Sequence, residues 1–224
     1  MPKYRNFKRS ASYIRLNIMV SLIIVSAAVS YLIGSFPTAY LLVKKFYRFD
    51  IRSAGSGNVG GRNSYETTGD KRIGIVVVII DALKGATAYL AAVLCFGGSF
   101  AVITVSILAV VIGHNYSVWI GFRGGRGLAT ACGAMSPSFP VVVVLWGAMY
   151  MLASRITKDV IAANKAACVL SACLAWVLPQ TWLYFGAHPT DGTIIGVRVF
   201  ITAILGLLFV SHLRKAPAKT NAGE

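Results

Sequence analysis

Long uncharged, apolar runs alternate along this chain with short segments rich in lysine, arginine and glycine. The first run, residues 16–43, is uncharged for 28 positions and contains Pro37 near its end. A helix of about 20 apolar residues crosses the hydrocarbon core of a bilayer. Proline breaks or bends a helix because it lacks an amide hydrogen. The pattern therefore predicts a transmembrane helix that breaks or bends at Pro37.

Further apolar segments complete the predicted helical framework. The segment 128–153 is apolar but contains two prolines, so we expect two short helices that enter the membrane and return to the same side. Full spans are expected at 73–96, 99–119, 161–178 and 194–213. The sequence thus predicts an all-α, polytopic integral membrane protein with about seven transmembrane or half-membrane helices.

The composition supports this fold class. Hydrophobic residues make up 56% of the 224 positions, which is too apolar for a soluble domain of this size. We expect a single membrane-embedded domain over residues 16–213, a basic N-terminal tail over 1–15 and a basic cytoplasmic tail over 214–224. The cysteines lie in apolar stretches without the spacing of metal ligands, so we predict no metal site and no organic cofactor.

The charge distribution predicts the orientation of the helices. The net charge is +15, and lysine and arginine favour cytoplasmic loops. Four loops that the layout places on one side hold 7, 2, 3 and 3 basic residues: 44–72, 123–126, 155–165 and 214–219. The loops 97–99 and 179–193 hold none. We therefore expect the C-terminus inside and the N-terminus outside, although five basic residues near the N-terminus run against this orientation. No soluble basic domain or aromatic platform indicates a nucleic-acid partner.

Two polar, glycine-rich runs interrupt the apolar pattern, at residues 55–63 and 124–127. Hydrocarbon cannot hydrate a bare backbone, so exposed N–H groups at a membrane edge need a polar ligand. Phosphate is the natural ligand for such loops, and lysines and arginines surround both runs. The pattern predicts an enzyme that acts on phosphorylated substrates at the bilayer surface.

Three ordered motifs carry a resemblance to a known family. Residues 34–42 read Gly-Ser-Phe-Pro-Thr-Ala-Tyr-Leu-Leu, and 50–52 and 55–60 follow as Asp-Ile-Arg and Gly-Ser-Gly-Asn-Val-Gly. Residues 81–85 read Asp-Ala-Leu-Lys-Gly. Gly-His-Asn at 113–115 precedes Phe-Arg-Gly-Gly-Arg-Gly-Leu-Ala-Thr at 122–130. In this order, the motifs resemble the bacterial acyl-phosphate-dependent glycerol-3-phosphate acyltransferases.

The resemblance implies a reaction and its partners. A fatty acyl group passes from acyl phosphate to the 1-hydroxyl of glycerol 3-phosphate, which gives 1-acyl-glycerol 3-phosphate and phosphate. This is the first step of phospholipid synthesis in the bacterial inner membrane, with the active site on the cytoplasmic face. The implied partners are acyl phosphate, glycerol 3-phosphate, membrane lipid and the enzyme that makes acyl phosphate.

The motifs also supply candidate site residues. His212 lies outside these motifs, near the C-terminus, where the family tends to read His-Arg-x-Asn. Through this resemblance it is a candidate to orient or deprotonate the acceptor hydroxyl, with the substrate's own phosphate as the alternative base. Ser56 and Arg126 complete the catalytic set. Lys84 lies one helical turn from Asp81, so a structural ion pair is an equal alternative for these two residues. The candidates for phosphate binding are Ser35, Arg52, Ser56, Gly57, Asn58, Gly60, Arg62, Asn63, Lys84, His114, Gly124, Gly125, Arg126 and Gly127.

The chain departs from the family pattern at several positions. Arg62 stands where the family has threonine, Glu66 where it tends to have arginine, Arg126 where it usually has lysine and Lys215 where it has asparagine. These changes indicate an altered phosphate cradle. They leave open a diverged paralogue that acylates another phosphorylated acceptor, or a non-catalytic anion-binding or transporting protein. A transporter should show paired broken helices in two related halves, and the sequence has no such symmetry.

Overall fold

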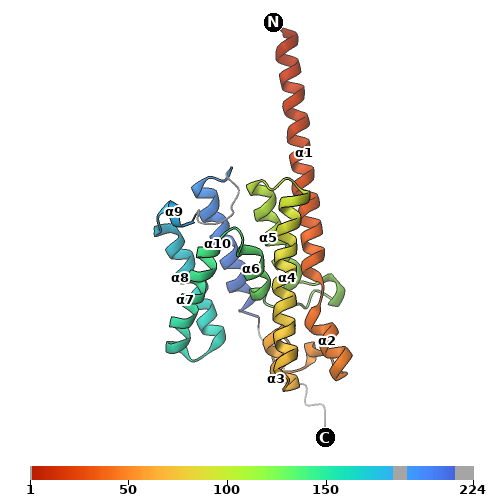
Figure 1. The fold of residues 1–224 in the computed structure, drawn as a ribbon, viewed down its shortest axis with the longest axis vertical. Coiled ribbons are helices and arrows are strands. Elements are labelled where there is room, and N and C mark those ends of the chain that lie inside the picture. The colour runs from red at the N-terminus through yellow and green to blue at the C-terminus, as the bar shows by residue number, and fades with distance from the viewer. Residues whose placement is uncertain (1, 184–190, 215–224) are drawn as a thin grey trace.

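The computed structural model describes residues 2–183 and 191–214, and all regular structure in these ranges is helical (Figure 1). The expected C-terminal tail therefore lies almost entirely outside the described residues. The helices are α1 Pro2–Ser35, α2 Thr38–Tyr47, α3 Gly61–Thr68, α4 Lys71–Cys95, α5 Phe100–Asn115, α6 Leu128–Met135, α7 Pro140–Thr157, α8 Val160–Val177, α9 Gln180–Leu183 and α10 Ile194–Ser211.

Six described segments are long and apolar enough to cross a membrane. They are α4, α7, α8, α10, the segment that contains α5 and the segment Ser12–Tyr47, which joins α1 and α2. The 8-residue helix α6 is about 12 Å long, which makes it a half-membrane helix. The all-α membrane fold class is therefore confirmed. The break at Pro37 is confirmed as well, because α1 ends at Ser35 and α2 begins at Thr38.

The expectation of two short helices over 128–153 is wrong in one respect. Helix α6 is short, but α7 has 18 residues and is long enough to span a bilayer. The physical reason is the place of Pro140, which is the first residue of α7. The amide of a first helical residue has no partner within the helix, so a proline there starts the helix and does not interrupt it.

Close contacts between backbones hold α6 in the interior. A Cβ atom on Gly85 of α4 would collide with the carbonyl of Thr130, and one on Gly133 of α6 would collide with the carbonyl of Ala82. Small residues allow membrane helices to approach at this distance. The start of α6, and with it the second glycine-rich loop, is therefore fixed against α4.

The two ends of the molecule differ in their loops. In Figure 1 the loops around α2 and α3, the α7–α8 turn and the end of α10 lie at one end, and the N-terminus and the α4–α5 turn lie at the other. The basic loops 44–72 and 155–165 of the predicted layout thus share one end of the bundle (Figure 1).

Candidate functional site

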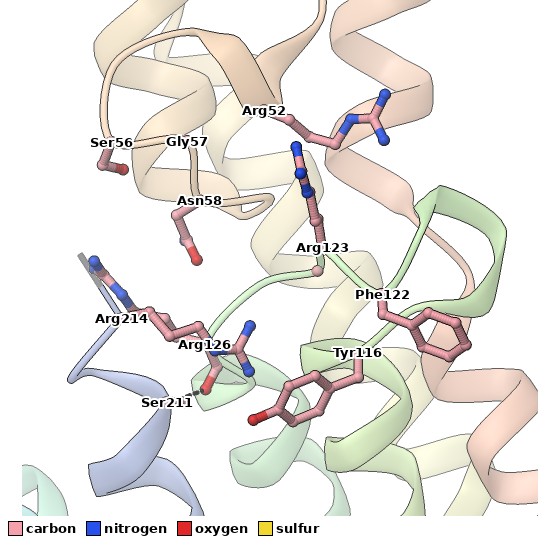
Figure 2. A pocket seen from close by; sticks show the side chains of 11 residues that line it. Arg52, Ser56, Gly57, Asn58, Tyr116, Phe122, Arg123, Arg126, Ser211 and Arg214 are labelled. Carbon is pink, nitrogen blue, oxygen red and sulfur yellow. Dashed lines mark hydrogen bonds between the residues drawn. The ribbon is translucent and has the colours of Figure 1, made fainter. Parts of the chain in front are cut away.

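A cleft of about 380 Å³ opens where the two glycine-rich loops meet the end of α10 (Figure 2). Three stretches of chain that are far apart in sequence form its walls. The lining residues are Arg52, Ser56, Gly57 and Asn58 from the first loop, Tyr116, Phe122, Arg123, Gly124 and Arg126 from the segment between α5 and α6, and Ser211 and Arg214 from the end of α10.

The cleft contains six of the residues that the sequence singles out: Arg52, Ser56, Gly57, Asn58, Gly124 and Arg126. The prediction missed Tyr116, Phe122, Arg123, Ser211 and Arg214. Two of the missed residues are cations next to selected positions, since Arg123 precedes Gly124 and Arg214 follows His212 by two places. Counting every basic residue beside the motifs would have found both.

The cleft is strongly cationic. Four arginines line it, and among the described residues no aspartate or glutamate does. The guanidinium of Arg126 makes no hydrogen bond to any residue in the described part of the chain. Burial, and then the positive charges of Arg62 and Arg214, lowers the pKa of Arg126. Cations that crowd together in this way attract an anion.

Arg52 is held in place before any ligand binds. Its Nη2 atom lies 2.6 Å from Oδ2 of Asp50, and its Nη1 atom donates to the carbonyl of Ile120 at 3.0 Å. The hydrogen bonds with Arg52 lower the pKa of Asp50, and the same contact raises the pKa of Arg52. The guanidinium also lies 4.9 Å from the ring centroid of Tyr40. Arg52 therefore presents a fixed positive charge to the cleft.

The end of α10 is tied to the opposite wall. The Ser211 hydroxyl donates to the carbonyl of Arg126 at 2.9 Å. Nη1 of Arg214 donates to the carbonyl of Asn115 at 2.9 Å, and its guanidinium lies 4.2 Å from the ring centroid of Tyr116. These contacts fix the distance between the last span and the second glycine-rich loop.

Asn63 braces the first loop from outside the cleft. Its Oδ1 atom accepts from the amide of Ser56 at 2.9 Å, and its Nδ2 atom donates to the carbonyl of Ala54 at 3.1 Å. Gly57, which this brace encloses, has a φ of 68°, a left-handed conformation that favours glycine. Gly60 and Gly127 do not line the cleft either, and stand directly before α3 and α6.

Several of the backbone N–H groups that the sequence predicts as phosphate ligands are already used within the protein. Five of these amides already donate within the protein, those of Ser56, Gly57, Gly60, Gly124 and Gly125. Internal hydrogen bonds stabilise the loops. The groups that remain available to a ligand are the Ser56 hydroxyl, the Asn58 side-chain amide, the arginines and the backbone N–H groups of Asn58 and Arg126, which donate to no described residue.

His212 lies behind the cleft wall in a closed hydrogen-bond chain. The indole Nε1 of Trp146 donates to Oδ1 of Asn164 at 3.0 Å, which turns the Asn164 amide toward Nε2 of His212 at 2.5 Å. Nδ1 lies 2.7 Å from the carbonyl of Leu208, so Nδ1 carries the proton and Nε2 accepts. Burial lowers the pKa of His212, and the hydrogen bond with the Leu208 carbonyl partly opposes this shift. Both ring nitrogens are therefore occupied.

Arg62 also lies outside the cleft. Its Nε atom is 2.7 Å from Oε1 of Glu66, one helical turn later in α3, and both side chains are about half exposed. The two departures from the family pattern at these positions thus compensate each other in a surface ion pair. They have opposite effects on the pKa of Arg126, which Arg62 lowers and Glu66 raises.

The other predicted residues surround a second, small hollow next to the cleft. Ser35, Lys84, His114 and Gly125 line this hollow, and Gly124 lines both spaces. Lys84 forms an ion pair with Asp81 there, as the spacing in the sequence indicates.

The sequence is similar to one family of known proteins. Residues 24–219 match the family model described as glycerol-3-phosphate acyltransferase. Glycerol-3-phosphate acyltransferase 1 of Dehalococcoides mccartyi is 32% identical over 195 residues, which cover 85% of this chain and 88% of the relative. Glycerol-3-phosphate acyltransferase 2 of Moorella thermoacetica is 40% identical over 148 residues, or 64% of this chain and 75% of the relative.

Solved structures agree with these relatives. The crystal structure of PlsY, an integral membrane glycerol 3-phosphate acyltransferase, in its glycerol 3-phosphate form superposes with a TM-score of 0.66 at 29% identity. The match covers 85% of this chain and 87% of that chain. The lysophosphatidic acid form of PlsY superposes with a TM-score of 0.67 at 28% identity, over 85% and 88% of the two chains.

Proposed function

Because the chain belongs to the glycerol-3-phosphate acyltransferase family, it is a membrane enzyme that acylates glycerol 3-phosphate, and we propose that acyl phosphate is its acyl donor. The products are 1-acyl-glycerol 3-phosphate and inorganic phosphate. The observation that carries the proposal is a cleft lined by four arginines and, among the described residues, no carboxylate. Two phosphate groups must be held side by side in this reaction, and such a cleft neutralises both.

The reaction needs little covalent help from the protein. The 1-oxygen of glycerol 3-phosphate forms a bond to the acyl carbonyl carbon, and the bond from that carbon to the phosphate oxygen breaks. The hydroxyl proton leaves with the phosphate. Since an acyl phosphate is already activated, the enzyme has to align the two substrates and stabilise the charge on the leaving phosphate. Fixed arginines perform both tasks.

A small apolar hollow supports placing the acyl phosphate on one side of the cleft. The hollow, of about 20 Å³, lies between α6, α7 and α10 and starts two residues after Arg126. Its lining is Leu128, Ala131, Cys132, Met135, Val142, Val143, Trp146, Leu205 and Leu208. We therefore place the phosphate of the donor against Arg126 and Arg214, with its acyl chain directed toward this hollow and the membrane. The glycerol 3-phosphate then lies against Arg52, Ser56 and Asn58.

The proton acceptor in this proposal is a phosphate oxygen of the substrates. His212 was one candidate base, but Asn164 donates to its Nε2 atom and its Nδ1 atom faces the Leu208 carbonyl. Neither nitrogen has a lone pair free for the acceptor hydroxyl, so the geometry supports the alternative base. His212 serves to anchor the end of α10, from which Ser211 and Arg214 reach the cleft.

We place the cleft at the cytoplasmic face of the bacterial inner membrane. The support is the positive-inside rule, because the basic loop 44–72 contributes Arg52 and Ser56 to the cleft and lies at the same end of the bundle as the basic α7–α8 turn (Figure 1). Acyl phosphate would reach it from the enzyme that makes this donor, and the lipid product would leave into the membrane. Residues 16–213 then form one membrane domain between two basic tails, 1–15 and 214–224.

Substitution of Ser56 tests the assignment of the glycerol 3-phosphate side. We expect Ser56→Ala to lower kcat/KM for glycerol 3-phosphate by about tenfold to a hundredfold, because a hydrogen bond to a charged phosphate is lost. The matched control is Ser53→Ala, whose hydroxyl donates to the Asp50 carbonyl and does not line the cleft. Acyl transfer in lipid vesicles measures both. A Ser56→Ala enzyme with unchanged kinetics would remove Ser56 from the site.

The surface ion pair of α3 should have little influence on the reaction. We expect Arg62→Thr with Glu66→Arg, which restores the usual family residues, to change kcat/KM by less than about threefold, since an exposed pair contributes little and lies outside the cleft. Initial rates in the same assay test this. A tenfold loss would show that Arg62 takes part in phosphate binding after all.

A further inference from the structure

A second cluster of charged groups lies inside the membrane domain, behind the cleft. Asp81 and Lys84 of α4 and His114 of α5 are 3%, 8% and 7% exposed. Charged side chains within a membrane are costly, so they occur where they pair and where function requires them. The mechanism above does not use this cluster.

Lys84 reaches the point where the first span breaks. Its Nζ atom lies 2.9 Å from Oδ1 of Asp81 and donates to the carbonyl of Phe36 at 3.1 Å. Phe36 lies in the break between α1 and α2. The neighbouring carbonyl, that of Ser35, accepts from the hydroxyl of Ser117, which lies just beyond α5. One ammonium group thus fixes the break against α4, and the adjacent residue is tied to the end of α5.

His114 connects the same pair to the second glycine-rich loop. Its Nδ1 atom lies 3.7 Å from Oδ1 of Asp81. The other side of the ring packs against Gly125, where a Cβ atom would collide with Nε2 of His114. The amide of Gly125 also donates to the His114 carbonyl at 3.0 Å. The loop that carries Arg123 and Arg126 is therefore seated on His114.

We propose that Lys84 is a positioning residue for acyl transfer. Together with Asp81 and His114, it sets the loop 123–126 against the break between α1 and α2, and so fixes the spacing of the arginines across the cleft. The carboxylate of Asp81 balances the ammonium, so the cluster supplies geometry and adds no net charge. This inference rests on the proposed function of the cleft. A positioning role predicts that loss of Lys84 weakens the binding of glycerol 3-phosphate, whereas a role in folding alone predicts unchanged affinity in the folded protein.

The test removes both charges together. In Asp81→Asn with Lys84→Met, no unpaired charge stays buried, which avoids the main penalty of breaking a buried pair. Methionine is about as long as lysine but cannot donate to Phe36. We expect a melting temperature near that of the parent protein, and a KM and a calorimetric Kd for glycerol 3-phosphate that rise at least about tenfold. Asp81→Asn alone keeps the amine donor and should change both constants less.

Two controls separate positioning from folding. Arg198→Met removes another intramembrane cation that donates to a carbonyl, that of Leu178 at 3.2 Å, and lies far along α10 from the cleft. It should leave the KM for glycerol 3-phosphate unchanged, since loss of folded protein lowers the apparent kcat alone. Gly125→Ala, which displaces the loop from His114 without touching the ion pair, should raise KM and Kd as the double variant does.

The outcomes are decisive in both directions. Parent-like KM and Kd in the folded double variant would overturn the inference and leave Lys84 as a folding partner of Asp81. If the double variant does not fold, Gly125→Ala decides by the same two constants. The Kd does not depend on turnover, so a parent enzyme that binds glycerol 3-phosphate but does not use acyl phosphate would contradict the proposed donor and not this inference.

Discussion

Arg126→Ala is expected to lower kcat/KM for acyl transfer by about a hundredfold to a thousandfold, the range for loss of one preorganised group at a developing charge. Arg126 is a partly buried cleft residue whose guanidinium makes no hydrogen bond to another described residue. It is therefore available to bind an anion. It stands two residues before the apolar hollow between α6, α7 and α10, and in the proposed arrangement it meets the leaving phosphate of the donor. Without it, the negative charge that grows on that phosphate loses its nearest cation.

The matching variant Arg126→Lys should retain activity within about tenfold of the parent. Lysine keeps the positive charge but loses the bidentate geometry of arginine, and the family usually has lysine at this position. Arg155→Ala, at the last turn of α7 and outside the cleft, serves as the control for loss of a basic residue. Steady-state kinetics in vesicles measure all three. Equal activity of Arg126→Ala and the parent would contradict the assignment of the leaving phosphate.

The helical framework could be predicted because the length of an apolar run is a local property of the sequence. The positions of prolines are local too, and they predict the break at Pro37 and the short helix α6. Helix α7 was misjudged because the effect of Pro140 depends on its place in the helix, and the apolar pattern alone does not show that Pro140 is the first residue.

The lining of the cleft could be predicted where its residues lie within the motifs, as with Ser56, Asn58 and Arg126. Tyr116 becomes a cleft residue only through the packing of α10 against the end of α5, which no local pattern reveals. Arg62 was assigned to phosphate because its charge was considered alone. A glutamate four residues later on the same helix was a visible sign of an ion pair.

The second large expected effect is the dependence of the acyl-transfer rate on the chemical class of the donor. An acyl phosphate presents a charged phosphate directly at its carbonyl carbon, where Arg126 and Arg214 can hold it. A thioester carries sulfur at that place, so it offers the arginines no phosphate to bind, and the charge that develops as the bond breaks lies on a thiolate sulfur, which is a weak hydrogen-bond acceptor. We expect thioester donors to be at least about a thousandfold slower than acyl phosphate.

The most direct test of the account is acyl transfer by the purified protein in lipid, with labelled glycerol 3-phosphate and three donors. Palmitoyl phosphate should give 1-acyl-glycerol 3-phosphate and inorganic phosphate in equal amounts. Palmitoyl-CoA and the acyl carrier protein thioester should give no product above background. Product formed from a thioester at a rate comparable to that from palmitoyl phosphate would contradict the proposed donor and the role of the arginine-lined cleft.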